Sequence, residues 1–215
     1  MLVLGLHTAG PACDVAILGD GQLLAQQREE MARGQDARLP GLVAQVCMDA
    51  GVSLKDVDRI GIVTGPGSFT GVRVGVAYAR GLALALRVPC IGVTSLEAAL
   101  PAGQQGSAIV LAPAQRRAPE ITYWTQLFRS GSATGPAQER TLEAVTDLLM
   151  SHPHMVYGDA DELNRVMPAL DIRAASATAL RTAGLAAQLD PDLHPPKPSY
   201  ARAPDALLPG GKSPA

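Results

Sequence analysis

The chain has 215 residues, 47% of them hydrophobic, which is enough to bury one large core or two small ones. Its 18 Lys and Arg against 20 Asp and Glu give a net charge of -2. Because no basic run is long enough to neutralise a row of phosphates, these features argue against a protein that binds nucleic acid by itself.

The cysteines and the N-terminus indicate a cellular location. Cys13, Cys47 and Cys90 are far apart and match no metal-binding spacing, so we expect reduced thiols in a core. The apolar N-terminus lacks a basic segment and is interrupted by His7 and Asp14, which argues against a signal peptide. No stretch approaches a membrane span. We therefore expect a soluble, cytoplasmic protein with no membrane partner.

Three antiparallel strands are expected first. Residues 2–8 (LVLGLHT) and 12–18 (ACDVAIL) have strand patterns, and Gly-Asp-Gly at 19–21 predicts a hairpin turn into QLLAQQRE. A helix over about residues 38–50 follows, with Gly51 suited to a left-handed C-cap. Its apolar face consists of Leu39, Leu42, Val43, Val46, Cys47 and Ala50.

A glycine-rich loop separates the next strand from a second helix. RIGIVT (59–64) predicts a strand buried on both faces, as in parallel sheets. The loop GPGSFTGVRVG (65–75) follows, and Ser68 or Thr70 can cap the second helix. VPCIGVT (88–94) predicts another buried strand, which leads into SLEAAL.

The resulting order is strand, strand, strand, helix, strand, helix, strand, which differs from the regular alternation of a doubly wound nucleotide-binding domain. It is the order of an RNase H-like lobe, assigned to residues 1–100. Residues 101–190 predict a smaller, degraded α/β lobe, and the proline-rich residues 191–215 predict an extended or partly disordered tail, of which SYARAPDA can return to the body. The fold class is thus α/β with two lobes.

The second lobe has weaker patterns. GSAIVLAP, EITYWTQLF and MVYG read as strands, and TLEAVTDLLM reads as a helix. A last helix, SATALRTAGLAAQL, is expected to place its apolar face at Leu180, Ala183, Ala187 and Leu189.

The glycine loop has several possible tasks. A phosphate loop needs GxxxxGK[ST], whereas Gly67 to Gly71 is one residue short. Gly65, Gly67 and Gly71 are spaced somewhat like a dinucleotide fingerprint, with Glu97 as a ribose-binding acid, but they follow the fourth strand instead of the first. Backbone geometry alone explains the glycines. It does not explain the aromatic Phe69 at the tip.

Two segments carry a family resemblance. GPGSFTGVRVGVAYARGLALAL and VPCIGVTSLEAAL resemble the TsaB family, also called YeaZ, and GPGSFTG is a specific signature of it. The resemblance covers most of residues 1–100 and continues through PEITYWTQLF and PSYARAPDA. It implies the ASKHA fold of actin-like and sugar-kinase-like proteins, in agreement with the element order above.

The resemblance also implies a function and partners. TsaB-like proteins support synthesis of N6-threonylcarbamoyladenosine (t6A) in tRNA as the non-catalytic partner of TsaD, together with the small ATPase TsaE, and form a homodimer when alone. No cofactor and no catalytic residue of this chain is then required. We expect tRNA to bind only through the complex, with Arg116 and Arg117 forming a solvated loop.

The catalytic relative TsaD is the strongest rival. It carries VNHLEGH, whose two histidines bind a metal, where this sequence reads VTSLEAA. Ser95 and Ala99 stand in place of those histidines, so the imidazole pair is absent and no metal site is expected. The alternative function is a nucleotide-binding ASKHA enzyme, either an ATPase or a metallopeptidase-like protein.

Three departures mark a divergent member of the TsaB family. The first strand carries His7 where the family has an aspartate that organises magnesium in ASKHA kinases, which argues against ATP hydrolysis. GQDARL replaces the usual H-S/T-x-x-L opening of the first helix. Gln115 or Ala114 stands where the family has an acidic residue, so no cofactor-binding residue is assigned in the second lobe.

The second helix suggests where a partner binds. Gly71, Gly75, Ala79 and Ala83 recur every four residues, and such a stripe lets another helix approach closely. Packing on the chain's own sheet explains it equally well, but the resemblance favours docking through the first two helices, about residues 38–50 and 69–86. The expected partner-binding residues are Leu39, Leu42, Val43, Val46, Phe69, Gly71, Arg73, Gly75, Tyr78, Ala79 and Leu82.

Overall fold

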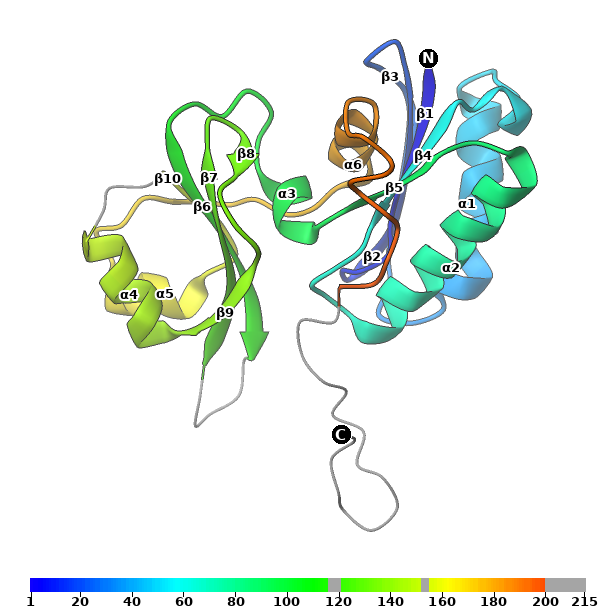
Figure 1. Ribbon diagram of the computed structural model, residues 1–215. Coiled ribbons are helices and arrows are strands. Elements are labelled where there is room, and N and C mark those ends of the chain that lie inside the picture. Colours follow the sequence, from blue (N-terminus) through cyan, green and yellow to red (C-terminus); the bar gives the residue numbers. More distant parts are fainter. Residues whose placement is uncertain (116–120, 152–154, 200–215) are drawn as a thin grey trace.

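The computed structural model describes residues 1–115, 121–151 and 155–199 and contains two β-sheets in separate lobes (Figure 1). The first sheet has the order β3-β2-β1-β4-β5, in which β1, β2 and β3 are antiparallel and β1, β4 and β5 are parallel. The predicted strands of this lobe are confirmed. Their bounds are Leu2–His7, Ala12–Gly19, Gln22–Glu30, Arg59–Val63 and Cys90–Val93 for β1 to β5.

Helices cover both faces of the first sheet (Figure 1). α1 (Gln35–Asp49) and α2 (Phe69–Leu86) lie side by side on one face, and α6 (Ala179–Ala186) lies on the other. The predicted caps are present: the Ser68 hydroxyl accepts a hydrogen bond from the Gly71 N–H at 3.2 Å, and Gly51 follows α1 with a φ of 67°. The short helix η1 (Leu54–Asp56) separates α1 from β4.

α6 lies close to the first sheet because the strands beneath it carry glycine. A Cβ atom on Gly5 would lie 2.1 Å from the Ala179 carbonyl oxygen, and one on Gly61 would lie 2.7 Å from the Ala186 Cβ. The helix therefore buries its smallest side, which corrects part of the expected apolar face: Ala179, Thr182, Ala183 and Ala186 are buried. Of the expected set Ala183 is buried, and Leu180, Ala187 and Leu189 are half-buried and pack against the same core.

The position of α6 also corrects the expected lobe boundary. The helix contacts β1, β2, β4 and β5, and its alanines belong to the core of the first lobe. Residues 101–190 therefore do not form one lobe, because their last helix returns to the first sheet.

The second sheet has the order β11-β10-β6-β7-β8, with β9 paired to β7. The long strands β6 (Ser107–Gln115) and β7 (Thr122–Arg129), the strand β10 (Met155–Gly158) and the helix α4 (Leu142–Ser151) match predicted elements. The short elements β8 (Ser132–Ala133), β9 (Gln138–Thr141), α5 (Asp161–Val166) and β11 (Ile172–Arg173) were not predicted, because they are too short or too polar to show a clear period.

Side chains alternate across β6 to form two small cores. Ala108 and Val110 pack on the side of α3 (Ser95–Ala99), together with Trp124. Ile109 and Leu111 pack on the opposite side, in a cluster with residues of α4 and α5. This alternation is the period of two of a strand, whose successive side chains point to opposite faces of the sheet.

The chain after α6 runs along the edge of the first sheet. The Gly92 N–H in β5 donates to the His194 carbonyl, and the Ser199 N–H donates to the Thr64 carbonyl, both at 2.8 Å. Of the two alternatives given for the tail, extended or disordered, residues 191–199 therefore fit an ordered segment that is held to the sheet. Residues 200–215, which include most of SYARAPDA, lie outside the described residues, as do Arg116, Arg117, His152 and His154.

Candidate functional site

The glycine loop is pressed against the end of β1. A Cβ on Gly67 would lie 2.4 Å from the Ala9 carbonyl oxygen, and a Cβ on Gly71 would lie 2.1 Å from the Thr8 carbonyl oxygen. On Gly75 it would lie 2.2 Å from the Thr8 hydroxyl, which itself donates to the Gly71 carbonyl at 2.7 Å. These contacts account for the three glycines without a bound ligand.

Most of the expected partner-binding residues lie inside the first lobe, because the apolar periods on which the prediction rested mark the sides of α1 and α2 that pack on the chain's own strands. In the folded chain these residues are covered, so the docking prediction is corrected for them. They are Leu39, Leu42, Val43, Val46, Gly71, Gly75 and Ala79; Ala83 of the stripe is also buried.

Four of the expected residues reach the surface. Phe69 is 41% exposed, and the Arg73 guanidinium lies 3.8 Å from the centre of its ring, a cation-π contact at the start of α2. Tyr78 and Leu82 are half-buried beside the core. For these four, contact with a partner remains a prediction.

The sequence analysis missed the outward side of α1 and α2. This side, which we call the two-helix face, carries small and apolar residues, of which Met48 is 68% exposed and Leu84 is 81% exposed. A signal was present in the sequence, because Ala77, Gly81 and Ala85 also recur every four residues. The face consists of Ala37, Gly41, Ala44, Met48, Ala77, Gly81, Leu84 and Ala85.

For two glycines of this face, no close packing within the chain requires the absence of a side chain. A Cβ on Gly81 would meet nothing within 4 Å, and a Cβ on Gly41 would meet only the Arg38 guanidinium at 3.6 Å. Glycine inside a helix costs roughly 0.5–1 kcal/mol relative to alanine. Gly41 and Gly81 therefore differ from Gly71 and Gly75, whose Cβ positions are occupied by contacts within the chain.

α2 is apolar on more than its buried side. Over its 18 residues the mean hydropathy is 1.2, so by length and composition alone it could cross a membrane, which corrects the expectation that no stretch comes near this threshold. The core helix of a soluble protein passes the same test, and α2 packs on β4. Because only 33% of this helix is buried, much of its apolar surface is available to a partner.

A cleft of about 660 Å³ lies between the two lobes. Its walls come from the end of β1, the glycine loop, α3, β6 and β7, and they include His7, Ser68, Leu111 and Trp124. Ser95 and Ala99, which the sequence analysis compared with the two histidines of TsaD, also line it. Among the described residues, no group of three or more His, Cys, Asp or Glu side chains could hold a metal ion.

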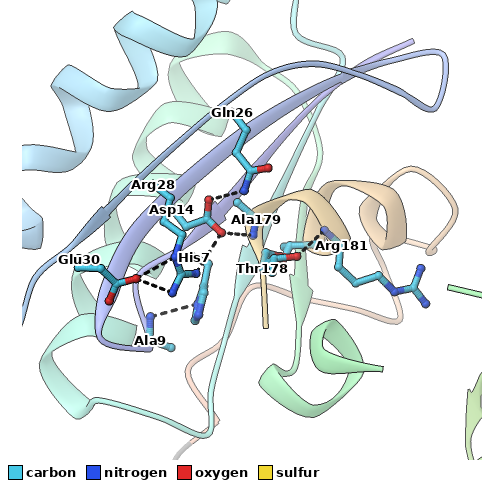
Figure 2. Close-up of polar contacts among 10 residues, drawn as sticks. His7, Ala9, Asp14, Gln26, Arg28, Glu30, Thr178, Ala179 and Arg181 are labelled. Atoms are coloured by element: carbon cyan, nitrogen blue, oxygen red, sulfur yellow. Dashed lines mark hydrogen bonds and ion pairs between the residues drawn. The ribbon is translucent and has the colours of Figure 1, made fainter. Parts of the chain in front are cut away.

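His7 lies at the first-lobe wall of the cleft (Figure 2). Its side chain is 6% exposed, and its Nδ1 accepts a hydrogen bond from the Ala9 N–H at 3.3 Å. Burial lowers the pKa of His7 to about 4, although the neighbouring Asp14 carboxylate opposes this shift. The imidazole is therefore neutral at neutral pH.

Asp14 lies opposite His7 in the β1–β2 register and is fully buried. Its carboxylate accepts hydrogen bonds from the Ala179 N–H at the start of α6, at 2.8 Å, and from the Gln26 amide, at 2.9 Å (Figure 2). Arg28 approaches it at 3.8 Å. These contacts join the start of α6 to the first sheet, which is a structural task for a buried acid.

The cysteines offer no activated nucleophile. Burial raises the pKa of Cys13 to about 11 and that of Cys90 to about 12, and it also raises the pKa of Cys47. All three thiols are free, as predicted, and they stay protonated at neutral pH.

Comparison with known proteins identifies relatives. The family model described as TsaD, tRNA N6-adenosine threonylcarbamoyltransferase, matches residues 24–188. The tRNA threonylcarbamoyladenosine biosynthesis protein TsaB of Escherichia coli (strain K12) is 34% identical over 157 residues, or 72% of this chain. The chain spans 66% of the length of that protein and 63% of three mycobacterial relatives.

Two solved structures from Pseudomonas aeruginosa are similar over nearly the whole chain. An uncharacterised protein with similarity to peptidase YeaZ matches with a TM-score of 0.72 and 26% identity, covering 94% of this chain and 99% of the other. YeaZ itself matches with a TM-score of 0.63 and 25% identity, covering 93% and 99%. The predicted α/β fold of the ASKHA type is thereby confirmed.

Proposed function

Because the chain belongs to the TsaB (YeaZ) family, we propose that it is a non-catalytic subunit in the biosynthesis of tRNA threonylcarbamoyladenosine. In this proposal the chain binds and activates the catalytic subunit TsaD, and the ATPase TsaE joins the pair. The modified adenosine is the one next to the anticodon, and tRNA contacts the chain only as part of the complex.

The two-helix face is the proposed contact with TsaD. Gly41 and Gly81 support this most directly, because each is an exposed helix glycine with open space above it. Helix axes approach each other to roughly 8 Å when the side chains at the contact are small. Met48 and Leu84 then supply exposed apolar area beside the close contact.

The same face is the proposed homodimer contact when TsaD is absent. Because one face cannot hold two partners at once, the homodimer and the heterodimer exclude each other. Raising the concentration of TsaD should therefore convert the homodimer into the heterodimer. No species should contain TsaD together with two copies of this chain joined through the face.

A non-catalytic role also agrees with the side chains of the cleft. Among the described lining residues Asp159 is the one charged side chain, and His7 is neutral. These residues include no lysine or arginine that could neutralise a polyphosphate. The protonated thiols supply no nucleophile. The alternative, an ATPase or metallopeptidase-like enzyme, predicts stoichiometric zinc or iron or ATP turnover that survives repurification; either result would replace our proposal.

Gly81→Leu tests the docking face. The added side chain enters open space on this chain and overpacks a helix contact, which costs about 1–3 kcal/mol, or a tenfold to hundredfold loss of affinity for purified TsaD. Gly135→Leu is the matched control, because Gly135 is an exposed second-lobe glycine that also has nothing within 4 Å of its Cβ position. Both variants should keep the wild-type circular dichroism spectrum. Unchanged TsaD affinity for Gly81→Leu would exclude this face.

A further inference from the structure

The charged residues of α2 are all arginines, and they lie on one flank of the helix. Arg73, Arg80 and Arg87 are exposed and seven residues apart, with Arg87 as the C-cap of the helix. Seven residues make nearly two full turns, so the three side chains follow a line of about 21 Å along the helix axis. We call this line the arginine stripe. Because its members are spaced apart, they form no continuous basic run in the sequence.

The stripe borders an open groove beside the C-terminal half of α2. The groove has a volume of about 630 Å³, and both Arg80 and Arg87 line it. Leu84, which lies between them along the helix, also lines it, together with apolar residues that include Val88 and Pro196. The described lining residues include no Asp or Glu. Two cations beside apolar surface, with no acid among them, favour an anionic ligand.

Most of the other arginines that the structure describes are bound within the chain. Arg38, for example, forms an ion pair with Glu29, and Arg59 donates to two carbonyl groups at the end of α6. Among the described residues, neither Arg80 nor Arg87 has a carboxylate within ion-pair distance. A cation at the C-terminal end of a helix is favoured by the helix dipole, which accounts for Arg87 but not for Arg80 in the middle.

An extended anion fits the stripe better than a small one, because the arginines repeat over about 21 Å. The planar guanidinium group can donate two parallel N–H bonds to one phosphate. We propose that the arginine stripe contacts the phosphate backbone of the substrate tRNA while the chain is bound to TsaD.

This inference rests on the proposed function, which supplies tRNA as the polyanion and TsaD as the partner at the neighbouring two-helix face. Leu84 belongs to that face and also lines the groove, so the stripe runs along the border of the TsaD contact. Three phosphate contacts on a chain of net charge -2 are too few for tight binding by the chain alone. The stripe therefore agrees with tRNA binding only through the complex.

The double variant Arg80→Gln with Arg87→Gln tests the stripe. The measurement is the affinity of the heterodimer with TsaD for unmodified substrate tRNA, by fluorescence anisotropy over a series of KCl concentrations. Loss of two phosphate contacts should reduce the slope of log affinity against log salt by about 2, and it should weaken binding at least about tenfold at roughly 0.1 M salt. Because both side chains are exposed, the circular dichroism spectrum and the affinity for TsaD should stay at the wild-type values.

Two further double variants are matched controls. Arg33→Gln with Arg129→Gln removes the same charge from exposed arginines elsewhere on the chain and should leave the salt slope nearly unchanged. Arg80→Lys with Arg87→Lys keeps the charge of the stripe, so its salt slope should stay close to that of the wild type.

The outcomes separate this inference from the proposed function. Wild-type tRNA affinity and salt slope in the glutamine variant of the stripe would overturn the inference and leave the role with TsaD intact. Reduced affinity for TsaD, with unchanged tRNA binding by the heterodimer that remains, would assign the arginines to an acidic surface of TsaD and would also overturn it. If the wild-type chain does not bind TsaD, the proposed function fails first and the inference fails with it.

Discussion

Gly75 and Gly81 lie on the same helix, but a side chain added to each would meet different surroundings. The Cβ position of Gly75 is filled by Thr8 and Ile62, whereas that of Gly81 is open. The first glycine lets α2 press on its own sheet, and the second costs helix stability without improving any internal contact. A glycine in a helix therefore fits both close packing and open space, and only its surroundings in the folded chain tell which.

The largest effect is expected from Gly75→Leu, which fills the inward space. A Cβ alone would lie 2.2 Å from the Thr8 hydroxyl and 3.0 Å from the Ile62 Cδ1, so α2 would have to move off β1 and β4. We expect loss of the native fold, because the strain exceeds the usual 1–3 kcal/mol of overpacking. Circular dichroism during heating measures this. A wild-type melting curve for Gly75→Leu would show that the inward packing described here is wrong.

The two glycines also show what the sequence could not decide. Period and capping predicted α2 from Ser68 to Leu86 well, because local hydrogen bonds and amphipathicity fix a helix. They did not show which side of α2 is buried on the chain's own sheet and which is exposed, since both sides carry small residues every four positions. Likewise, the sequence predicted the last helix but not its return to the first sheet, which depends on Gly5 and Gly61 far away in the chain.

The candidate sites were predictable to different degrees. The family resemblance singled out Ser95 and Ala99 as standing in place of a histidine pair, but that they line an inter-lobe cleft with His7 follows only from the fold. Contacts between residues far apart in sequence leave no periodic signal, so the sequence could not place His7 and Ser95 on the same cleft.

Acid should weaken the inward packing reversibly through His7, the neighbour of Thr8. The pKa of His7 is about 4 in the folded chain and 6.5 in its ordinary state, so the unfolded chain binds more protons between these values. Its contribution to stability is therefore complete above about pH 6.5 and is lost as the pH falls towards 4, by about 3 kcal/mol in total. Denaturant unfolding of wild type and His7→Gln at pH 7 and pH 5 measures the difference.

The variant removes only the histidine contribution, because Asp14 and the other carboxylates remain in both proteins. His7→Gln should accordingly lose less stability between pH 7 and pH 5 than the wild type does. Equal losses in the two proteins would mean that His7 takes up its proton without opposing the fold.

The smallest effect is expected from Gly81→Ala. Compared with Gly75→Ala, it tests whether the two glycines differ in their role within the chain. Alanine adds a methyl group to open space and removes the conformational cost of glycine, so the isolated chain should gain roughly 0.5–1 kcal/mol. Gly75→Ala is the matched comparison and should destabilise, since its Cβ has no room beside Thr8. If Gly81→Ala also destabilises the isolated chain, then Gly81 has an internal role after all, and its value as a marker of the docking face is lost.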